Sequence, residues 1–174
     1  WTHGTYIGAT LSSETTAAAV GAVGVVRRDP MAMLPFIGYN ANDYIAHWIK
    51  IGQTHDPAKL PRIYQVNWFR RGAESGKFLW PGFGENSRVL KWIVGRLEGT
   101  AEGKDTVVGI VPADGALDTD GLDVSPEIVE KCLKVDPEDW KKEIPLIDEW
   151  FEKLGNVPSE VKEQLAILKK NVGV

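Results

Sequence analysis

The sequence predicts a mixed α/β (α+β) fold: a mixed sheet with a hairpin and flanking helices, followed by a helical C-terminus. Three observations predict this class. β-branched and aromatic residues cluster in short runs that indicate strands. Apolar residues recur at helical spacing between these runs. The last third of the chain contains two consecutive helix starts, each with a capping residue, a proline and an acidic residue in order.

In the N-terminal third, residues 1–11 indicate a strand, and residues 25–28 indicate another. Residues 12–24 between them are almost all small. Two interpretations stay open for this stretch: an alanine-rich helix capped by Ser12 or Ser13, or a mobile flap whose small side chains let it close without clashes. A short helical turn is expected from Asp29, ending before Pro35, and a helix over 40–51.

The middle of the chain predicts a hairpin, a helix and a strand. Residues 60–69 have strand composition, and the turn at 73–76 brings the chain back into Phe78. The next helix ends near Gly99, and a strand follows over 107–111. The expected apolar face of that helix consists of Leu90, Ile93, Val94 and Leu97.

In the last third, helices are expected to start at Ser125 and at Asp136. Pro145 should kink or split the second, whose pattern stops at Gly155. A final helix over 161–168 completes the helical region at 125–172. No linker is long enough to predict two independent domains. Because the chain begins without methionine, 1–174 is expected to form one portion of a longer protein.

Composition excludes several functions. A formal charge of −4 argues against general nucleic-acid binding or a membrane-surface role, and no apolar run is long enough to span a bilayer. The single cysteine, Cys132, rules out an intrachain disulfide and is compatible with a cytoplasmic location.

Few motifs indicate catalysis within the chain. The acidic run at 113–123 resembles a calcium loop, but Ala116 stands where its first carboxylate is expected, so a solvated turn is favoured. Cys132 lies in a predicted helix among apolar residues and is expected to be inert. The sequence contains neither a nucleophile elbow nor a GxxxxGK[ST] phosphate loop.

The most informative segment is the aromatic loop from Phe69 to the KFLWPGFGENSR run. Proline and glycine at Pro81-Gly82 prevent a regular strand, so several large rings are presented from irregular backbone. Two interpretations are open. Phe69, Phe78, Trp80 and Phe83 could be core residues, with Asn86 or Ser87 capping the next helix; alternatively, they could form a pocket for a flat ring.

The chain resembles GTP-dependent phosphoenolpyruvate carboxykinases over nearly its whole length. The resemblance runs in order through WTHG, GATLSSETTAAA, RRDPMAMLPFIGYN, DYIAHWI, VNWFRR, KFLWPGFGENSRVLKWI, GIVPA and IPLIDEW. The segment RRDPMAMLPFIGYN is typical of the actinobacterial branch. The resemblance implies the C-terminal, nucleotide-binding portion of the carboxykinase fold.

The family decarboxylates oxaloacetate and phosphorylates the enolate from GTP, giving phosphoenolpyruvate, GDP and carbon dioxide with Mn²⁺ or Mg²⁺. By resemblance, the GTP-binding residues of this chain are Phe69, Phe78, Phe83, Gly84, Glu85 and Asn86. Residues 12–24 match the family's active-site lid, whose matching positions are Ser12, Ser13, Glu14, Thr15, Thr16, Ala17, Ala18 and Ala19.

The resemblance also places the phosphate loop, the metal ligands and the oxaloacetate-binding arginines upstream, so no catalytic or metal residue is assigned in this chain. The family is usually monomeric and gluconeogenic, and the isolated segment is expected to be inactive. Two other hypotheses stay open: a non-catalytic purine-nucleotide-binding module, and a structural domain whose aromatic residues form its core.

Overall fold

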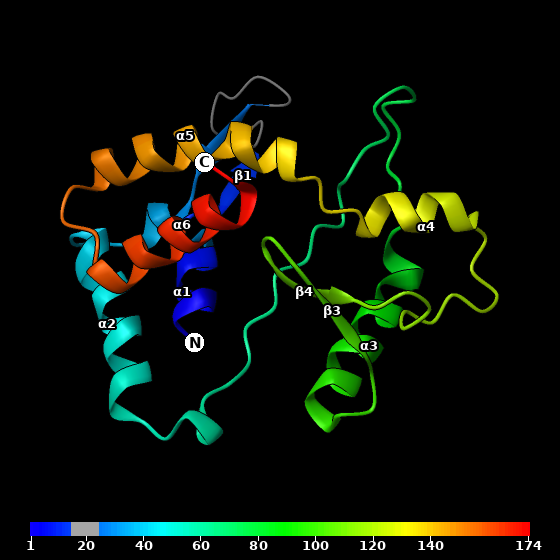
Figure 1. The fold of residues 1–174 in the computed structure, drawn as a ribbon, viewed down its shortest axis with the longest axis horizontal. Coiled ribbons are helices and arrows are strands. Elements are labelled where there is room, and N and C mark those ends of the chain that lie inside the picture. Colours follow the sequence, from blue (N-terminus) through cyan, green and yellow to red (C-terminus); the bar gives the residue numbers. More distant parts are fainter. Residues whose placement is uncertain (15–24) are drawn as a thin grey trace. The chain divides into compact units, whose positions relative to one another are not determined.

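The computed structural model describes residues 1–14 and 25–174, and these form two compact units (Figure 1). The first unit comprises residues 1–63 and 138–174; the second comprises residues 64–137. The expectation that 1–174 forms one portion of a longer protein stays a prediction. The first unit is therefore built from two separate segments of the chain, and the second unit from the segment between them.

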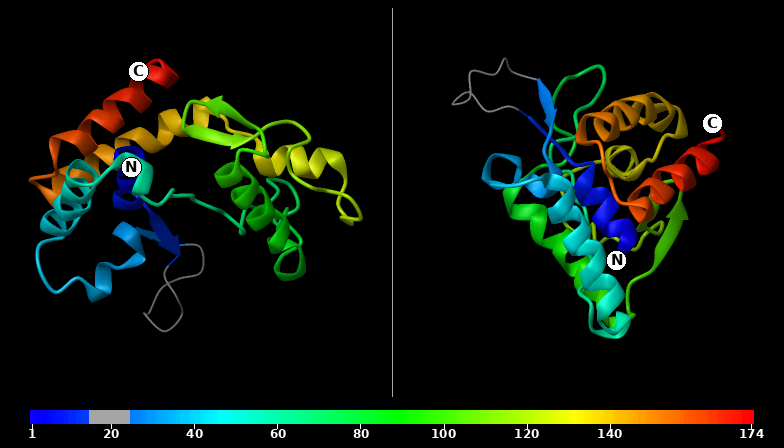
Figure 2. Two further views of the ribbon diagram at one scale, coloured as in Figure 1. Left: turned by 90° about the horizontal axis from the view of Figure 1, so that it is seen from below. Right: turned by 90° about the vertical axis from the view of Figure 1, so that its left-hand side faces the viewer.

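The first unit is mainly helical. Its α-helices are α1 (Thr2–Ala9), α2 (Ala41–Thr54), α5 (Pro137–Leu154) and α6 (Ser159–Val172), and its strands are β1 (Ser12–Glu14) and β2 (Val26–Arg28). The first residue of α5, Pro137, is counted with the second unit. Three 3-10 turns complete it: η2 (Pro30–Ala32), η3 (Leu34–Phe36) and η4 (Pro57–Lys59). Helix α1 packs against both α2 and α6, and these three helices lie side by side in Figures 1 and 2.

The strand expected over residues 1–11 is wrong, because Thr2–Ala9 is helical. Thr5, Tyr6 and Ala9 lie on its buried face. Gly8 allows close approach, since a Cβ atom there would overlap the sulfur of Met31. Tertiary burial thus overrides the strand preference of the β-branched and aromatic side chains.

The expected strand at 25–28 is confirmed as β2, which pairs antiparallel with β1. Asp29, which follows β2, connects β1 to η3: its buried carboxylate accepts hydrogen bonds from Ser13 Oγ at 2.8 Å and from the Leu34 amide at 2.9 Å. Arg28 donates to Thr10 O at 2.9 Å and forms an ion pair with Glu143 at 2.6 Å. Of the predicted lid, Ser12, Ser13 and Glu14 lie in β1, whereas 15–24 lie outside the described residues.

The second unit contains η5 (Phe83–Glu85), α3 (Asn86–Glu98), the hairpin of β3 (Gly103–Thr106) and β4 (Gly109–Pro112), and α4 (Pro126–Leu133). Its buried core is small and consists of Trp80, Trp92 and Leu117. Partly buried residues pack around this core, among them Tyr64, Trp68, Val89, Ile93, Val129 and Cys132.

The strand expected over 60–69 is wrong as well. Pro61 has no amide hydrogen to donate, and among the described residues no neighbouring strand pairs with this segment. Its apolar residues serve different units instead. Ile63 lies against Gly4 in the first unit, whereas the Tyr64 ring meets the Trp92 ring edge-on at 6.1 Å in the second.

The helix before Gly99 is confirmed as α3, and Gly99 ends it in the left-handed conformation with φ of 74°. Its expected apolar face is wrong in part, because Leu90, Val94 and Leu97 are exposed. Trp92 and Gly95 are buried instead. The Trp92 indole donates to Glu102 O at 3.0 Å, which turns this face of the helix inward.

The mixed α/β class and the helical C-terminus are confirmed, with six α-helices in the described residues. In place of a mixed sheet, however, these residues form two separate two-stranded antiparallel pairs. The run predicted as a strand at 107–111 contains the turn at Val107 and Val108 and strand β4, because a two-residue turn joins β3 to β4 as an antiparallel hairpin.

The predicted helix starts at Ser125 and Asp136 are confirmed by α4 and α5, and the final helix by α6. Helix α5 continues through Pro145, so the proline does not split it. It ends at Leu154, before Gly155 as expected. None of the helices in 1–14 and 25–174 has the length and apolar character needed to cross a membrane.

Candidate nucleotide-base site

A short hairpin brings Phe69 and Phe78 together. The Leu79 amide donates to Arg70 O at 2.8 Å, and the Gly72 amide donates to Lys77 O at 2.9 Å. Gly76 makes the turn with φ of 63°. The two phenylalanine rings then lie 5.9 Å apart, with 61° between their planes. Both rings are open to solvent, with exposed fractions of 70% for Phe69 and 49% for Phe78.

Two arginines hold this hairpin. The Arg71 guanidinium lies 4.0 Å from the centre of the Phe78 ring and donates to Gly76 O at 2.8 Å. Arg70 donates to Cys132 O at 3.3 Å and to Lys134 O at 2.7 Å, at the C-terminal end of α4. Neither role was predicted from the sequence. The paired arginines after Phe69 were the only signal for them.

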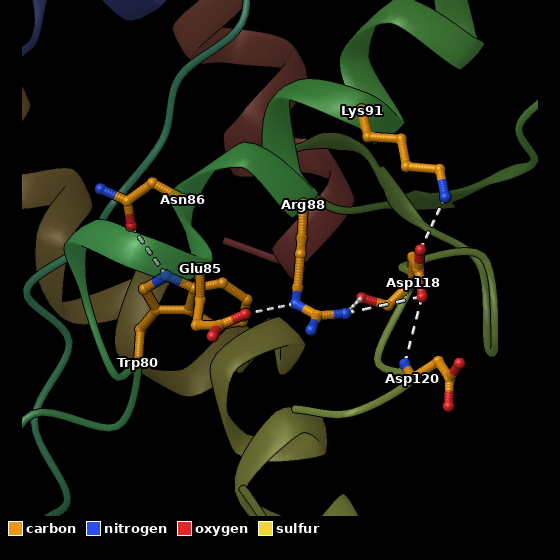
Figure 3. Close-up of polar contacts among 7 residues, drawn as sticks. All are labelled: Trp80, Glu85, Asn86, Arg88, Lys91, Asp118 and Asp120. Carbon is orange, nitrogen blue, oxygen red and sulfur yellow. Dashed lines mark hydrogen bonds and ion pairs between the residues drawn. The ribbon is translucent and has the colours of Figure 1, made fainter. Parts of the chain in front are cut away.

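Trp80, two residues after Phe78, has the opposite environment. It is 7% exposed and belongs to the core with Trp92 and Leu117. The interpretation of Trp80 as a pocket wall is therefore wrong: its ring stabilises the unit from inside. Its indole nitrogen donates to Asn86 Oδ1 at 2.9 Å, which connects the core to the start of α3 (Figure 3).

Phe83 points into solvent from the next turn. Gly82 adopts φ of 99°, and the Glu85 amide donates to Gly82 O at 2.9 Å, forming η5. The Phe83 ring is 97% exposed and, within the part of the chain that the structure describes, stacks on no other ring. The structure therefore brings two of the three predicted cradle rings together and leaves the third open. None of the three is a core residue.

The acidic and amide residues of the FGEN segment are held in place. Asn86 is bound by Trp80, and the Glu85 carboxylate pairs with Arg88 Nε (Figure 3). Arg88 also donates to Asp118 O at 3.1 Å and lies 3.6 Å from the Asp118 carboxylate. Lys91 completes this chain of contacts with an ion pair to Asp118 at 2.6 Å.

These contacts explain the charge states of the network. The hydrogen bond from Lys91, followed by that from the Asp120 amide, lowers the pKa of Asp118 below its ordinary value. The hydrogen bond to Glu85 raises the pKa of Arg88 above its ordinary value. The predicted solvated turn at 113–123 is thus tied to α3 by Asp118.

Burial raises the pKa of Cys132, which agrees with the predicted inert thiol.

The chain belongs to a known family of P-loop domains. Residues 1–171 match the phosphoenolpyruvate carboxykinase C-terminal P-loop domain family. The family expected from the sequence is therefore confirmed.

Several similar proteins carry the name "Phosphoenolpyruvate carboxykinase [GTP]". Those of Paenarthrobacter aurescens and Renibacterium salmoninarum, both actinobacteria, are 53% and 54% identical over 174 residues. That of Anaeromyxobacter dehalogenans is 51% identical over 173 residues. Each match covers 99% of this chain but 28% of the relative, so the chain spans less than a third of these proteins.

Proposed function

We propose that this chain is the C-terminal nucleotide-binding portion of a GTP-dependent phosphoenolpyruvate carboxykinase. The reaction would convert oxaloacetate and GTP to phosphoenolpyruvate, GDP and carbon dioxide, and serve gluconeogenesis in the cytoplasm. Support comes from the family match over 1–171 and from relatives more than 50% identical that bear this name.

The role of this segment is to bind the guanine base. The observation that carries the proposal is the division of aromatic residues: Trp80 is in the core, while Phe69, Phe78 and Phe83 present their rings to solvent. Exposed apolar side chains that cluster on a surface commonly mark ligand-binding or interaction sites. Stacking against them accepts any purine, so the choice of guanine depends on polar groups of Gly84, Glu85 and Asn86 at the start of α3.

Residues 12–24 are proposed as the lid. Support comes from the sequence match of 12–19 to the family's lid. It also comes from the antiparallel pairing of β1 with β2, which brings together the described residues on either side of 15–24. Closure of such a loop over the substrates would exclude water and protect the enolate from protonation before phosphoryl transfer.

The remaining chemistry is assigned to the rest of the longer protein. Among residues 1–14 and 25–174, no group of three or more His, Cys, Asp or Glu side chains could hold a metal ion. These residues therefore do not fit the Mn²⁺ or Mg²⁺ that the family uses. Oxaloacetate and phosphoenolpyruvate would likewise bind outside this segment.

Nucleotide titration of the full-length protein tests the proposal. Base binding should change the tryptophan fluorescence, because Trp68 and Trp80 lie beside the hairpin and the FGEN segment. GDP should produce a stronger change than ADP, because the proposed site prefers guanine. An equal response to the two nucleotides would remove the guanine-specific claim. Preferential binding of GDP without turnover of oxaloacetate would instead favour a non-catalytic purine-binding module.

A further inference from the structure

We propose that Trp80 is a positioning residue for guanine selection, because its indole N–H fixes the orientation of the Asn86 amide. This inference rests on the proposed guanine site. The contact that carries it is the 2.9 Å hydrogen bond from Trp80 Nε1 to Asn86 Oδ1. A core residue thereby controls which atom of the amide faces a ligand.

The direction of this hydrogen bond leaves only one amide orientation. An indole nitrogen can donate a hydrogen bond but cannot accept one, so its partner must be the amide oxygen. The amide nitrogen then points away from Trp80, as Figure 3 shows. Within the described residues this nitrogen has no hydrogen-bond partner, and Asn86 is only partly buried. Asn86 therefore offers an N–H₂ donor to a ligand.

A fixed donor distinguishes purines by their substituent at position 6. Guanine and hypoxanthine carry an oxygen there, which accepts a hydrogen bond, whereas adenine carries an amino group, which donates one. A donor held against the adenine amino group would leave both groups unpaired. If the amide could rotate, its oxygen would accept from adenine equally well. Selection therefore depends on preventing that rotation.

The surroundings of Trp80 make it a rigid support. Its ring is 7% exposed and packs with Trp92 and Leu117, so the indole cannot swing away with the loop. Asn86 is the first residue of α3, and its backbone is fixed by the helix. Both ends of the hydrogen bond are thus held by structure outside the base site.

The test uses Trp80→Phe in the full-length protein, with Trp92→Phe as the matched control. Both substitutions remove an indole N–H from the same core, and both residues are 7% exposed. The Trp92 indole donates to Glu102 O rather than to Asn86. Calorimetric titration with GDP, IDP and ADP should show the GDP-to-ADP and IDP-to-ADP affinity ratios falling about three- to tenfold in Trp80→Phe, because the released amide can also accept from adenine. Trp92→Phe should preserve the wild-type ratios.

A double-mutant cycle separates positioning from packing. Asn86→Ala should weaken GDP binding, and adding Trp80→Phe to it should cost nothing further in the GDP-to-ADP ratio, because Trp80 acts through Asn86. Wild-type ratios in Trp80→Phe, or additive losses in the double variant, would overturn the inference. A wild-type protein without GDP preference would instead refute the proposed function itself.

Should Trp80→Phe fail to fold, hydrogen exchange of ¹⁵N-labelled indole groups in the wild-type protein decides. GDP and IDP should slow exchange at the Trp80 indole more than ADP does, and leave Trp92 unaffected. Identical exchange with all three nucleotides would overturn the inference.

Discussion

Replacing Phe83 by alanine tests whether this ring belongs to a ligand site or to the fold. The side chain is 97% exposed, so the free protein buries almost none of it. Truncation should change the free energy of unfolding by no more than about 0.5 kcal/mol, as at ordinary surface positions. A core phenylalanine or tryptophan would instead cost about 3–5 kcal/mol.

The expected loss in binding is larger than the loss in stability. Stacking of a base on an aromatic side chain contributes about 1–3 kcal/mol by alanine substitution. At about 1.4 kcal/mol per tenfold change, Phe83→Ala should weaken GDP binding roughly 5- to 150-fold. Because stacking accepts every purine, ADP binding should weaken by a similar factor, and the GDP-to-ADP ratio should stay near the wild-type value.

The assay combines thermal unfolding with calorimetric titration of the full-length protein. Phe36→Ala is the matched control, since Phe36 is 77% exposed but lies outside the aromatic hairpin and η5. It should change neither melting temperature nor GDP affinity. A fall of several degrees in the melting temperature of Phe83→Ala would support the core interpretation, and an unchanged GDP affinity would remove Phe83 from the site.

Three further predictions follow from the described contacts. The pKa of Asp118 is lowered in the folded protein, so its ion pairs stabilise the fold at pH values above the ordinary carboxyl range, and this contribution disappears as pH falls through the folded pKa. The stability difference between wild type and Asp118→Asn, measured by urea denaturation, should therefore shrink on acidification from pH 7 to pH 3. Gly99→Ala should destabilise α3 by about 1 kcal/mol in the same assay because the residue has φ of 74°, whereas Gly84→Ala, at a glycine without positive φ, should cost less. Because burial raises its pKa, Cys132 should react with a thiol reagent at pH 7 more slowly than in the urea-unfolded protein, and equal rates would contradict its placement against the core.

The helices whose ends have local capping signals were predicted correctly from the sequence. Helices α4 and α5 begin at a proline preceded by serine or aspartate, and α3 ends at Gly99, so local signals determine their bounds. Where tertiary contacts decide, the predictions were wrong. Helix α1 depends on close packing at Gly4 and Gly8, and the segment after Pro61 lacks the partner that a strand requires.

The candidate site was predictable to a similar extent. Three rings and a polar turn were visible as a motif, but which rings face solvent was not, because Phe78 and Trp80 stand two residues apart in the same loop. The partners of the FGEN segment were also hidden. Glu85 and Arg88 are neighbours at helical spacing, whereas the contact from Arg88 to Asp118 joins residues 30 positions apart.

The Pro81-Gly82 turn explains how one loop can serve both stability and recognition. It separates Trp80, which faces the core, from Phe83, which faces solvent, since Gly82 takes a backbone conformation that other residues rarely adopt. The rings outside the core can contribute affinity but cannot distinguish guanine from adenine. That distinction needs a polar group with a fixed orientation, and the only described hydrogen bond to the side chain of Asn86 comes from the core. If the proposed guanine site is correct, its selectivity depends on core packing, and a substitution that loosens Trp80 should alter nucleotide choice before it abolishes nucleotide binding.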